Sequence, residues 1–350
     1  MNRFTKMIAC SVASVALACG LAACGSASNT GGSASAASTA SAASTTSAAQ
    51  TADVRVASLK GPTSIGLVDF MDEKENATEG TTYSFTVAGA ADEITPQVIQ
   101  GNIDIALVPA NVASVLYNRT NGGVQVVDIN TLGVLWVVTG DDSINSISDL
   151  AGHTVYMTGK GATPEYLMSY LLNQAGITDQ VTMEYKSEAT EVASELASNP
   201  SAIAVLPEPY VTSVCNRVSG LEPRISLTDA WSSTEAGENG SQLVTGVTVV
   251  RTEFLKQHPD LVSEFVQGQR ESVEQVKADP AAAAQLVVNL GIIDNAKIAE
   301  QAIPRCNLTC ITGQEMQDTL AGYYQVLYDA DPASVGGTLP DDGFYCLNAL

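Results

Sequence analysis

The sequence predicts an α/β protein in which sheets flanked by helices form two lobes. Three successive strand–loop–helix units begin near residue 54, and such alternation indicates a sheet covered by helices. Two long apolar runs, residues 133–139 and 243–250, lack polar alternation, as expected for strands buried on both faces. They bracket a long segment, so we expect two crossings between the lobes and a second lobe inserted into the first.

Residues 1–23 have the pattern of a cleaved secretory signal peptide. Arg3 and Lys6 precede an apolar run that is short for a membrane-spanning helix and ends in small residues. The run closes with Leu-Ala-Ala-Cys at residues 21–24, which resembles a bacterial lipobox. We therefore expect Cys24 to carry a lipid such as palmitate and to anchor the protein at the outer face of a membrane.

Residues 24–52 would connect this anchor to the folded body. After Cys24 the tract contains Ser, Ala, Thr and Gly but neither charge nor aromatic side chain. Such a composition does not offset the entropy of ordering, so we interpret it as a flexible linker.

The first lobe is predicted to begin with strands at residues 54–59, 83–87 and 103–108. Each strand runs into a loop and then into a helix. In open sheets of this kind, ligands bind outside the carboxyl ends of the strands. The loops that follow these three strands contain Pro62, Thr63 and Ser64, then Gly89 and Ala90, then Pro109 and Asn111.

Residues 146–176 open the second lobe. They predict a helical turn at residues 148–150, a strand at residues 154–157 and a helix with Thr163 as its N-cap. Lys160 lies in the intervening loop between two glycines. Unpaired N–H groups at such a junction make a ready site for an anion or carboxylate, although an ordinary strand–helix crossover has the same pattern.

The remaining chain continues both lobes. We expect second-lobe strands at residues 181–185 and 202–206, the latter followed by Glu208 between two prolines. The pattern from residue 252 onward is helical, and Phe344 and Tyr345 are expected to pack back on the first lobe. The predicted first lobe is therefore residues 53–139 plus 245–350, and the second is residues 140–244.

Charge and cysteine content narrow the function classes. The formal net charge of −22 argues strongly against nucleic acid as a partner, because phosphates require a basic surface. Cys306, Cys310 and Cys346 lie close in sequence, so a disulfide among them is favoured over one to Cys215. Only two histidines are present, and neither is near a cysteine, so we expect no zinc site. No nucleophile motif such as GxSxG occurs.

The order of elements resembles the extracellular solute-binding lipoproteins of ABC importers, in the nitrate/sulfonate/taurine and thiamine-precursor class. The residues that carry this resemblance include the lipobox, ITPQVIQGNIDIALVPANVASVLYNR from Ile94, ISDLAGHTVY from Ile147 and IAVLPEPYVT from Ile203. The resemblance implies a periplasmic-binding-protein type 2 fold, with mixed sheets flanked by helices and a hinge between the lobes.

The resemblance also implies a function without a cofactor. A monomer would trap a small-molecule solute between its lobes and deliver it to permease and ATPase subunits. Loops at strand ends would then face the solute, which gives these candidate ligand-binding residues: Pro62, Thr63, Ser64, Gly89, Ala90, Pro109, Asn111, Lys160, Gly161, Ala162, Thr163 and Glu208.

We expect a small polar or anionic organic solute of the sulfonate, nitrate or thiamine-precursor kind, and its charge stays open. Lys160 and the helix N-termini favour an anion such as a sulfonate or nitrate, whereas Asp92, Glu93 and Glu208 favour a cation or zwitterion. Two other functions also fit the sequence. One is a cofactor-biosynthesis enzyme on the same two-lobe fold, and the other is a tethered sensor that binds a partner protein. Trp231 could stack on a flat solute or lie in the core.

Overall fold

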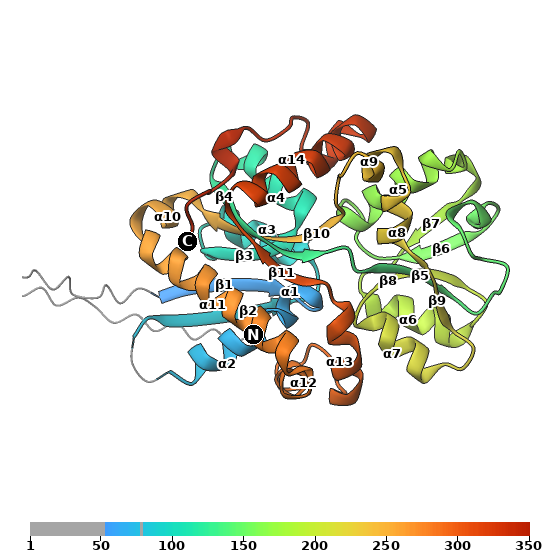
Figure 1. The fold of residues 1–350 in the computed structure, drawn as a ribbon, viewed down its shortest axis with the longest axis horizontal. Helices are drawn as coiled ribbons and strands as arrows, with labels where there is room; N and C mark the ends of the chain where they lie inside the picture. Colours follow the sequence, from blue (N-terminus) through green and yellow to red (C-terminus); the bar gives the residue numbers. More distant parts are fainter. Residues whose placement is uncertain (1–52, 78–79) are drawn as a thin grey trace, which may run out of the picture. The chain divides into compact units, whose positions relative to one another are not determined.

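The computed structural model describes residues 53–77 and 80–350 (Figure 1). The predicted signal peptide, Cys24 and the linker up to residue 52 lie outside these residues. Within the described ranges, no helix has both the length and the apolar character that a bilayer crossing requires.

The first sheet has six strands in the order β11-β4-β10-β3-β1-β2. β1 runs parallel to β2 and β3, whereas β10 is antiparallel to β3 and β4, so the sheet is mixed. Its strands are β1 (Asp53–Leu59), β2 (Thr82–Ala88), β3 (Ile105–Pro109), β4 (Val124–Leu132), β10 (Val244–Arg251) and β11 (Leu308–Ile311).

Side-chain alternation along β3 explains how this sheet is covered on both faces. Ile105 and Leu107 join an apolar cluster with α2 and α11, whereas Ala106 and Val108 join another with α3, α4 and α14. The helices of this lobe are α1 (Pro62–Ile65), α2 (Val68–Glu75), α3 (Ala91–Ile99), α4 (Ala110–Thr120), α10 (Thr252–Gln257), α11 (Pro259–Ala278), α12 (Pro280–Asn289), α13 (Ala296–Ala302), η3 (Ile303–Arg305), α14 (Gly313–Ala330), η4 (Pro332–Val335) and η5 (Asp342–Phe344).

The second sheet has five strands in the order β7-β6-β8-β5-β9. They are β5 (Leu135–Thr139), β6 (Thr154–Met157), β7 (Thr182–Tyr185), β8 (Ile203–Pro207) and β9 (Glu222–Ser226). The accompanying helices are η1 (Ile147–Leu150), α5 (Thr163–Gln174), η2 (Thr178–Gln180), α6 (Ala189–Ser198), α7 (Tyr210–Arg217), α8 (Leu227–Ser232) and α9 (Glu235–Glu238). Two mixed sheets flanked by helices confirm the predicted fold class.

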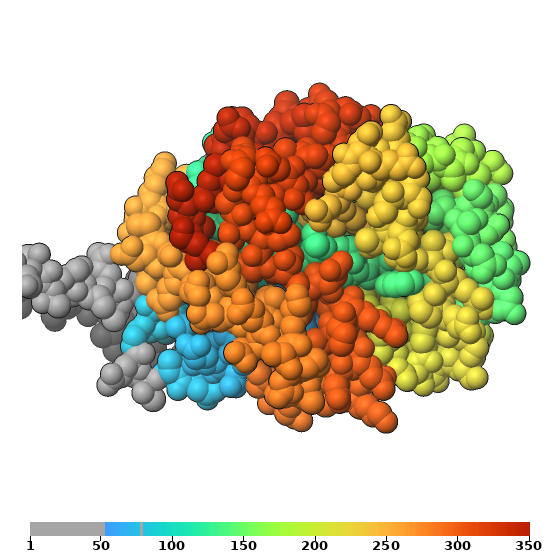
Figure 2. All heavy atoms as spheres, in the orientation of Figure 1, coloured from blue at the N-terminus to red at the C-terminus, as the bar shows by residue number. Residues whose placement is uncertain are grey.

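β5 lies in the other sheet from the one we predicted. Residues 133–139 were assigned to the first lobe, but β5 pairs with β8 and β9. The run is apolar on both faces, and a pattern without alternation does not show which sheet a buried strand joins. The crossing therefore lies at Gly133 and Val134, between β4 and β5. Figure 2 shows green atoms of the middle of the chain in a hollow between the orange and red C-terminal part and the yellow part.

Close packing surrounds the crossing. Asn307 donates from Nδ2 to the Gly133 carbonyl at 3.1 Å. A Cβ atom on Gly133 would lie 2.2 Å from Thr228 Oγ1, which is too short for any side chain to be accommodated without a shift. Glycine is thus required here by a close approach between neighbouring segments.

One apolar core runs through both lobes. It includes Val108 on the first sheet and Val137 and Val155 on the second. Aromatic rings extend it from α5 through α8 to α14, with centroid separations of 5.0 Å for Tyr170–Trp231 and 5.6 Å for Trp231–Tyr323. Trp231 is only 1% exposed and donates to the Ser241 carbonyl at 3.1 Å, so it is a core residue.

The C-terminal segment packs on the first lobe, as predicted. Phe344 is fully buried, and Tyr345 forms a β-bridge with Val126 on β4. β4, β9 and β11 were not predicted, because each contains polar residues that interrupt the apolar pattern. All four cysteines in the described residues are free thiols, so the favoured disulfide is not formed.

Two buried carboxylates lie in the first lobe. Asp104, which immediately precedes β3, accepts hydrogen bonds from the Arg55 and Arg251 side chains at 2.7 to 2.9 Å. Asp128 on β4 instead has neutral donors: Thr248 at 3.0 Å and Gln269 at 2.8 Å, both to Oδ1. Among the described residues, Asp128 Oδ2 has no hydrogen-bond partner.

Candidate functional site

The carboxyl ends of parallel strands from both sheets face a common cavity of about 170 Å³. β1, β2 and β3 contribute from the first sheet, and β6, β7 and β8 from the second. The residues that line it are Leu59, Lys60, Gly89, Ala90, Ala91, Pro109, Thr158, Gly159, Ala162, Pro164, Ser187, Glu188, Ala189, Pro207 and Tyr210. A solute here would contact both lobes at once.

Two larger cavities adjoin this one. A cavity of about 470 Å³ shares Ala90 and Gly159 with it and reaches α3 and α4, where Arg119 lies. A cavity of about 430 Å³ shares Lys60, Glu188 and Tyr210 with it and reaches α7 and the loop before α13. We call the three connected cavities the cleft and the one of about 170 Å³ the central cavity.

Six of the twelve predicted ligand-binding residues line the cleft. Gly89, Ala90, Pro109 and Ala162 line the central cavity. Lys160 and Gly161 line the cavity next to α3, together with Ala90 and Ala162. The Lys160 ammonium lies 5.6 Å from the centre of the Tyr185 ring.

The predicted residues of the first loop turn back toward the sheet. Thr63 and Ser64 both donate to the Leu59 carbonyl, at 3.0 and 2.6 Å, and Ser64 also pairs with the Ser58 hydroxyl at 2.6 Å. Pro62 is buried at the start of α1. These side chains hold the end of β1 and do not line the cleft.

Asn111 and Thr163 connect the lobes. Both are fully buried, and Thr163 donates to Asn111 Oδ1 at 3.2 Å. Asn111 Nδ2 donates to the Gly161 carbonyl at 3.3 Å and to the Ser334 carbonyl at 3.2 Å. The prediction that Thr163 is the N-cap of α5 was wrong: Ala162 is the N-cap, and the Thr163 hydroxyl bonds to the other lobe instead.

Glu208 is buried behind the cleft and does not line it. It is 1% exposed and accepts from the Thr212 N–H at 3.1 Å, while its Oε1 lies 3.8 Å from Arg305 of the first lobe. Burial raises the pKa of the Glu208 carboxyl, and the hydrogen bonds from Thr212 and the charge of Arg305 offset part of that shift.

Sequence reasoning missed the charged residues of the central cavity. Lys60 follows β1, Glu188 follows β7, and Tyr210 follows β8. The strand-end rule that selected Gly89 and Pro109 would also have found Glu188 and Tyr210, had it been applied to every strand.

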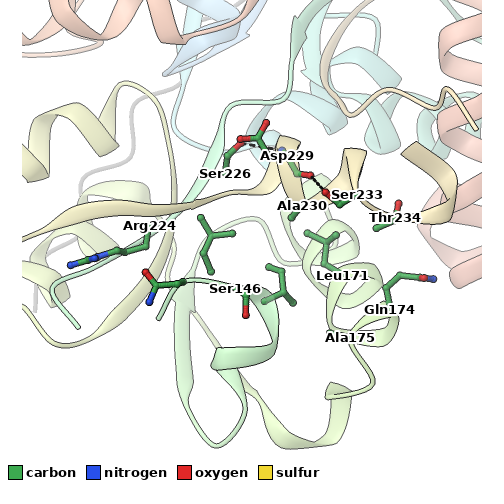
Figure 3. Close-up of a pocket in the computed structure, with 13 residues that line it drawn as sticks. Ser146, Leu171, Gln174, Ala175, Arg224, Ser226, Asp229, Ala230, Ser233 and Thr234 are labelled. Carbon is green, nitrogen blue, oxygen red and sulfur yellow. Dashed lines mark hydrogen bonds between the residues drawn. The ribbon is translucent and has the colours of Figure 1, made fainter. Parts of the chain in front are cut away.

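A further depression of about 430 Å³ lies within the second lobe (Figure 3). It is lined by η1, the C-terminal end of α5, β9 and α8, and Figure 3 shows Ser226 and Ser233 bonded to Asp229 there. The cleft lies at the opposite, N-terminal end of α5. The one basic side chain of this depression, Arg224, is paired with Asp142 and Glu222.

Metal and thiol chemistry have little support in the part of the chain that the structure describes. There, no group of three or more His, Cys, Asp and Glu residues could hold a metal ion. Burial raises the pKa of Cys215 to about 11 and also raises those of Cys306 and Cys346. High thiol pKa values disfavour the thiolate, the form in which cysteine acts as a nucleophile.

Solved structures share this architecture. The chain superposes on an ABC transporter protein from Parabacteroides distasonis with a TM-score of 0.70 and 22% identity, covering 84% of this chain and 99% of that one. The periplasmic aliphatic sulphonate binding protein SsuA from Escherichia coli gives a TM-score of 0.65 and 14% identity over 81% of this chain and 90% of that one.

The alkanesulfonate-binding protein SsuA from Xanthomonas axonopodis pv. citri, bound to MOPS, gives a TM-score of 0.64 and 13% identity over 84% of this chain and 96% of that one. These structures confirm the predicted two-lobe periplasmic-binding-protein fold. No curated protein sequence matches the chain.

The family assignment comes from the sequence itself. The model of the family described as NMT1/THI5 like matches residues 87–283. The match begins within β2, includes all of the second sheet and ends in α12. Because it covers more than half of the 350 residues, the chain belongs to the NMT1/THI5-like family.

Proposed function

We propose that this protein is the solute-binding component of an ABC importer, which captures a small polar organic solute and delivers it to a permease. Family membership and the solved structures of similar fold support this proposal. Two of those structures are of proteins described as sulfonate-binding. The protein would release its solute unchanged, without catalysis.

The observation that carries the proposal is the central cavity, which is lined from both lobes. A solute drives closure only when the closed state gives it contacts that the open state lacks. Here Gly89, Ala90 and Pro109 lie on one side, and Gly159 and Ala162 on the other. Binding would therefore depend on the separation of the lobes.

We assign roles within the cleft according to placement. Gly89, Ala90, Pro109 and Ala162 would contact a solute in the central cavity directly, and Lys160 and Gly161 would line the adjoining cavity next to α3. Asn111 and Thr163 would instead position the Lys160–Gly161 loop, because Asn111 bonds to the Gly161 carbonyl. The crossings near Gly133 and Leu243 would form the hinge, which places β5 in the inserted lobe.

The proposal includes an anchor outside the described residues. Cys24 would be lipidated and would become the new N-terminus on removal of residues 1–23, and residues 24–52 would tether a monomeric body near the permease and ATPase subunits. The lipobox-like sequence Leu-Ala-Ala-Cys supports this arrangement.

Filling the central cavity should abolish solute binding. Ala90 lines both the central cavity and its neighbour next to α3, so Ala90→Trp would occupy the space that closure requires. Thermal-shift screening of the full-length protein against sulfonates, nitrate, pyrimidines, amino acids and polyamines should give a ligand-induced rise in Tm. Ala90→Trp should lose that rise.

Ala230→Trp provides the matched control, because it introduces the same side chain into the depression within the second lobe. The control should keep the ligand response. A response lost in Ala230→Trp but kept in Ala90→Trp would place the site elsewhere. Turnover of any ligand would identify an enzyme, and no response across the panel would favour a tethered sensor.

Replacing Cys24 should release the protein from the membrane. Cells grown with labelled palmitate should incorporate label into the unaltered protein and not into Cys24→Ala, which should shift from the membrane fraction to the soluble fraction. Label in both would mean that another residue carries the lipid. Cys19→Ala, which changes a cysteine within the apolar run of the signal peptide, is the matched control and should remain labelled.

A further inference from the structure

Three helices that begin at the cleft, α3, α5 and α6, each have a first-turn glutamate bonded to the loop that precedes the helix. Glu93 accepts from the N–H groups of Gly89 and Ala90, at 3.1 and 3.0 Å. Glu165 accepts from the Gly161 N–H, and Glu191 accepts from the Ser187 N–H at 2.9 Å. In α3, α5 and α6 alike, a carboxylate four residues further along bonds to the loop that precedes the helix.

These glutamates place negative charge where an anionic solute would approach the three helices. Helix N-termini attract anions through unpaired N–H groups and the positive end of the helix dipole. Here the carboxylates bond to N–H groups of the loops just before the helices, and each carboxylate repels a second negative charge. The three glutamates therefore make these helix N-termini less favourable to an anion.

Two side chains of opposite charge face the central cavity from opposite lobes. Lys60 follows β1, and its backbone N–H is fixed to the Ala88 carbonyl at 2.9 Å. Glu188 precedes α6, and its Oε1 lies 3.2 Å from the position that a Cβ on Gly89 would take, so it faces the first lobe. Within residues 53–77 and 80–350, neither residue belongs to an ion pair.

Tyr210 lies near Glu188 in the cleft. It lines the same two cavities as Glu188. Asp294 lines the larger of these cavities together with Tyr210 and Glu188. Burial, and then the charges of Glu188 and Asp294, raise the pKa of Tyr210. A cation beside Glu188 could also contact the face of this ring.

Other basic groups near the cleft are less available to a solute in the central cavity. Lys186 is bonded to Glu184 and Glu195, at 3.0 and 2.9 Å. Arg119 and Lys160 line the cavity next to α3, Arg217 lines the cavity next to α7, and none of the three lines the central cavity. Lys60 is therefore the basic residue, and Glu188 the acidic residue, that line the central cavity.

We propose that the solute is a small zwitterion, with its cationic nitrogen at Glu188 beside Tyr210 and its acidic group at Lys60. This inference rests on the proposed function of solute capture. Glu188 accepts from the Thr190 hydroxyl at 3.2 Å but has no opposite charge beside it. A solute with only a negative charge would leave Glu188 without a counter-charge, and one with only a positive charge would leave Lys60 without one. A zwitterion gives each lobe an opposite charge to pair with, so both ion pairs form only when the lobes close on the solute.

Matched probes test this inference. Calorimetric titration of the full-length protein would compare taurine with ethanesulfonate, and ω-amino acids from glycine to 6-aminohexanoate with propionate and ethylamine. At least one zwitterion should bind about tenfold more tightly than its counterparts that lack one charge, since a charge-assisted hydrogen bond contributes this much or more.

Variants then assign each charge to its residue. Glu188→Gln should remove the preference for the zwitterion over the matched anion, and Lys60→Gln should remove the preference over the matched amine. Each should lower affinity for the zwitterion about tenfold. Glu238→Gln, an exposed position on α9, is the matched control and should bind as the unaltered protein does.

The possible failures are distinguishable. Equal binding of ethanesulfonate and taurine, or binding of propionate alone, would overturn the zwitterion and leave solute capture standing. Binding of ethylamine alone would do the same. If no zwitterion in the series binds, this inference is also overturned. The proposed function fails only if no compound of the wider panel raises Tm and Ala90→Trp therefore has no response to lose.

Discussion

Replacing Asp104 with asparagine is expected to lower the free energy of unfolding at pH 7 by about 3 kcal/mol or more. Asp104 is 2% exposed and accepts from the side chains of Arg55 and Arg251, as well as from the Arg55 N–H at 3.1 Å. These bonds join β1, β3 and β10. The Nδ2 group of an asparagine would place its N–H donors against the N–H donors of the two arginines. The substitution would also remove the negative charge with which the two guanidinium groups pair.

The effect of this substitution should depend on pH. Burial alone would raise the pKa of Asp104, but hydrogen bonds from Arg55 and Arg251 outweigh it and hold the pKa below its usual range. The ion pairs therefore stabilise the fold above the pKa of the unfolded chain, and that contribution is lost as the pH falls through the lower folded pKa.

Urea unfolding of the unaltered protein and of Asp104→Asn at several pH values would measure the loss of stability and its pH dependence. Asp142→Asn, which changes an exposed partner of Arg224, is the matched control and should cost less than about 1 kcal/mol. Equal losses in the two variants would contradict our account of Asp104.

Asp128→Asn should have the opposite effect on stability and raise the free energy of unfolding at pH 8 by about 2 kcal/mol. Burial raises the pKa of the Asp128 carboxyl to about 7, and bonds from Thr248 and Gln269 only partly offset it. A shift from 3.8 to about 7 corresponds to roughly 4 kcal/mol against the charged form. An asparagine N–H group left without a partner would cancel part of the gain.

The stability that Asp128→Asn gains at pH 8 should disappear at acidic pH. A raised folded pKa gives stability that is present below the unfolded pKa and is lost as pH rises toward about 7. The unaltered protein should therefore lose stability between about pH 4 and pH 7 through this group, and Asp128→Asn should not. Chemical unfolding at pH 4, 6 and 8 would test this, and a variant that is less stable than the parent at pH 8 would refute it.

Most of the fold was predictable because local signals and long-range packing agree. β6 was predicted at residues 154–157 and lies there, since a short apolar run is bounded by glycines on both sides. β5 was predicted as a strand but assigned to the wrong sheet, because pairing partners are not encoded in a continuous apolar run. β4 was missed because Asp128 and Asn130 interrupt its pattern, and only their buried partners Thr248 and Gln269 explain those polar residues.

The cleft was half predictable from the rule that ligands bind at strand ends. That rule located Gly89, Pro109 and Lys160, because a strand end is a local feature. It did not show that Thr163 bonds to Asn111, a residue 52 positions earlier, nor that Glu208 is buried behind the cleft. It also selected helix N-termini as anion sites without showing that Glu93, Glu165 and Glu191 bond to the loops just before those helices.

The apolar core shared by the two lobes has a consequence for how the protein folds. Rings from Tyr170 through Trp231 to Tyr323 join the inserted segment to α14, so each lobe leaves part of its apolar surface for the other to cover. The inserted segment on its own would expose this part to water. A chain still emerging from the ribosome would complete this packing only after α14, near its C-terminus, had been synthesised.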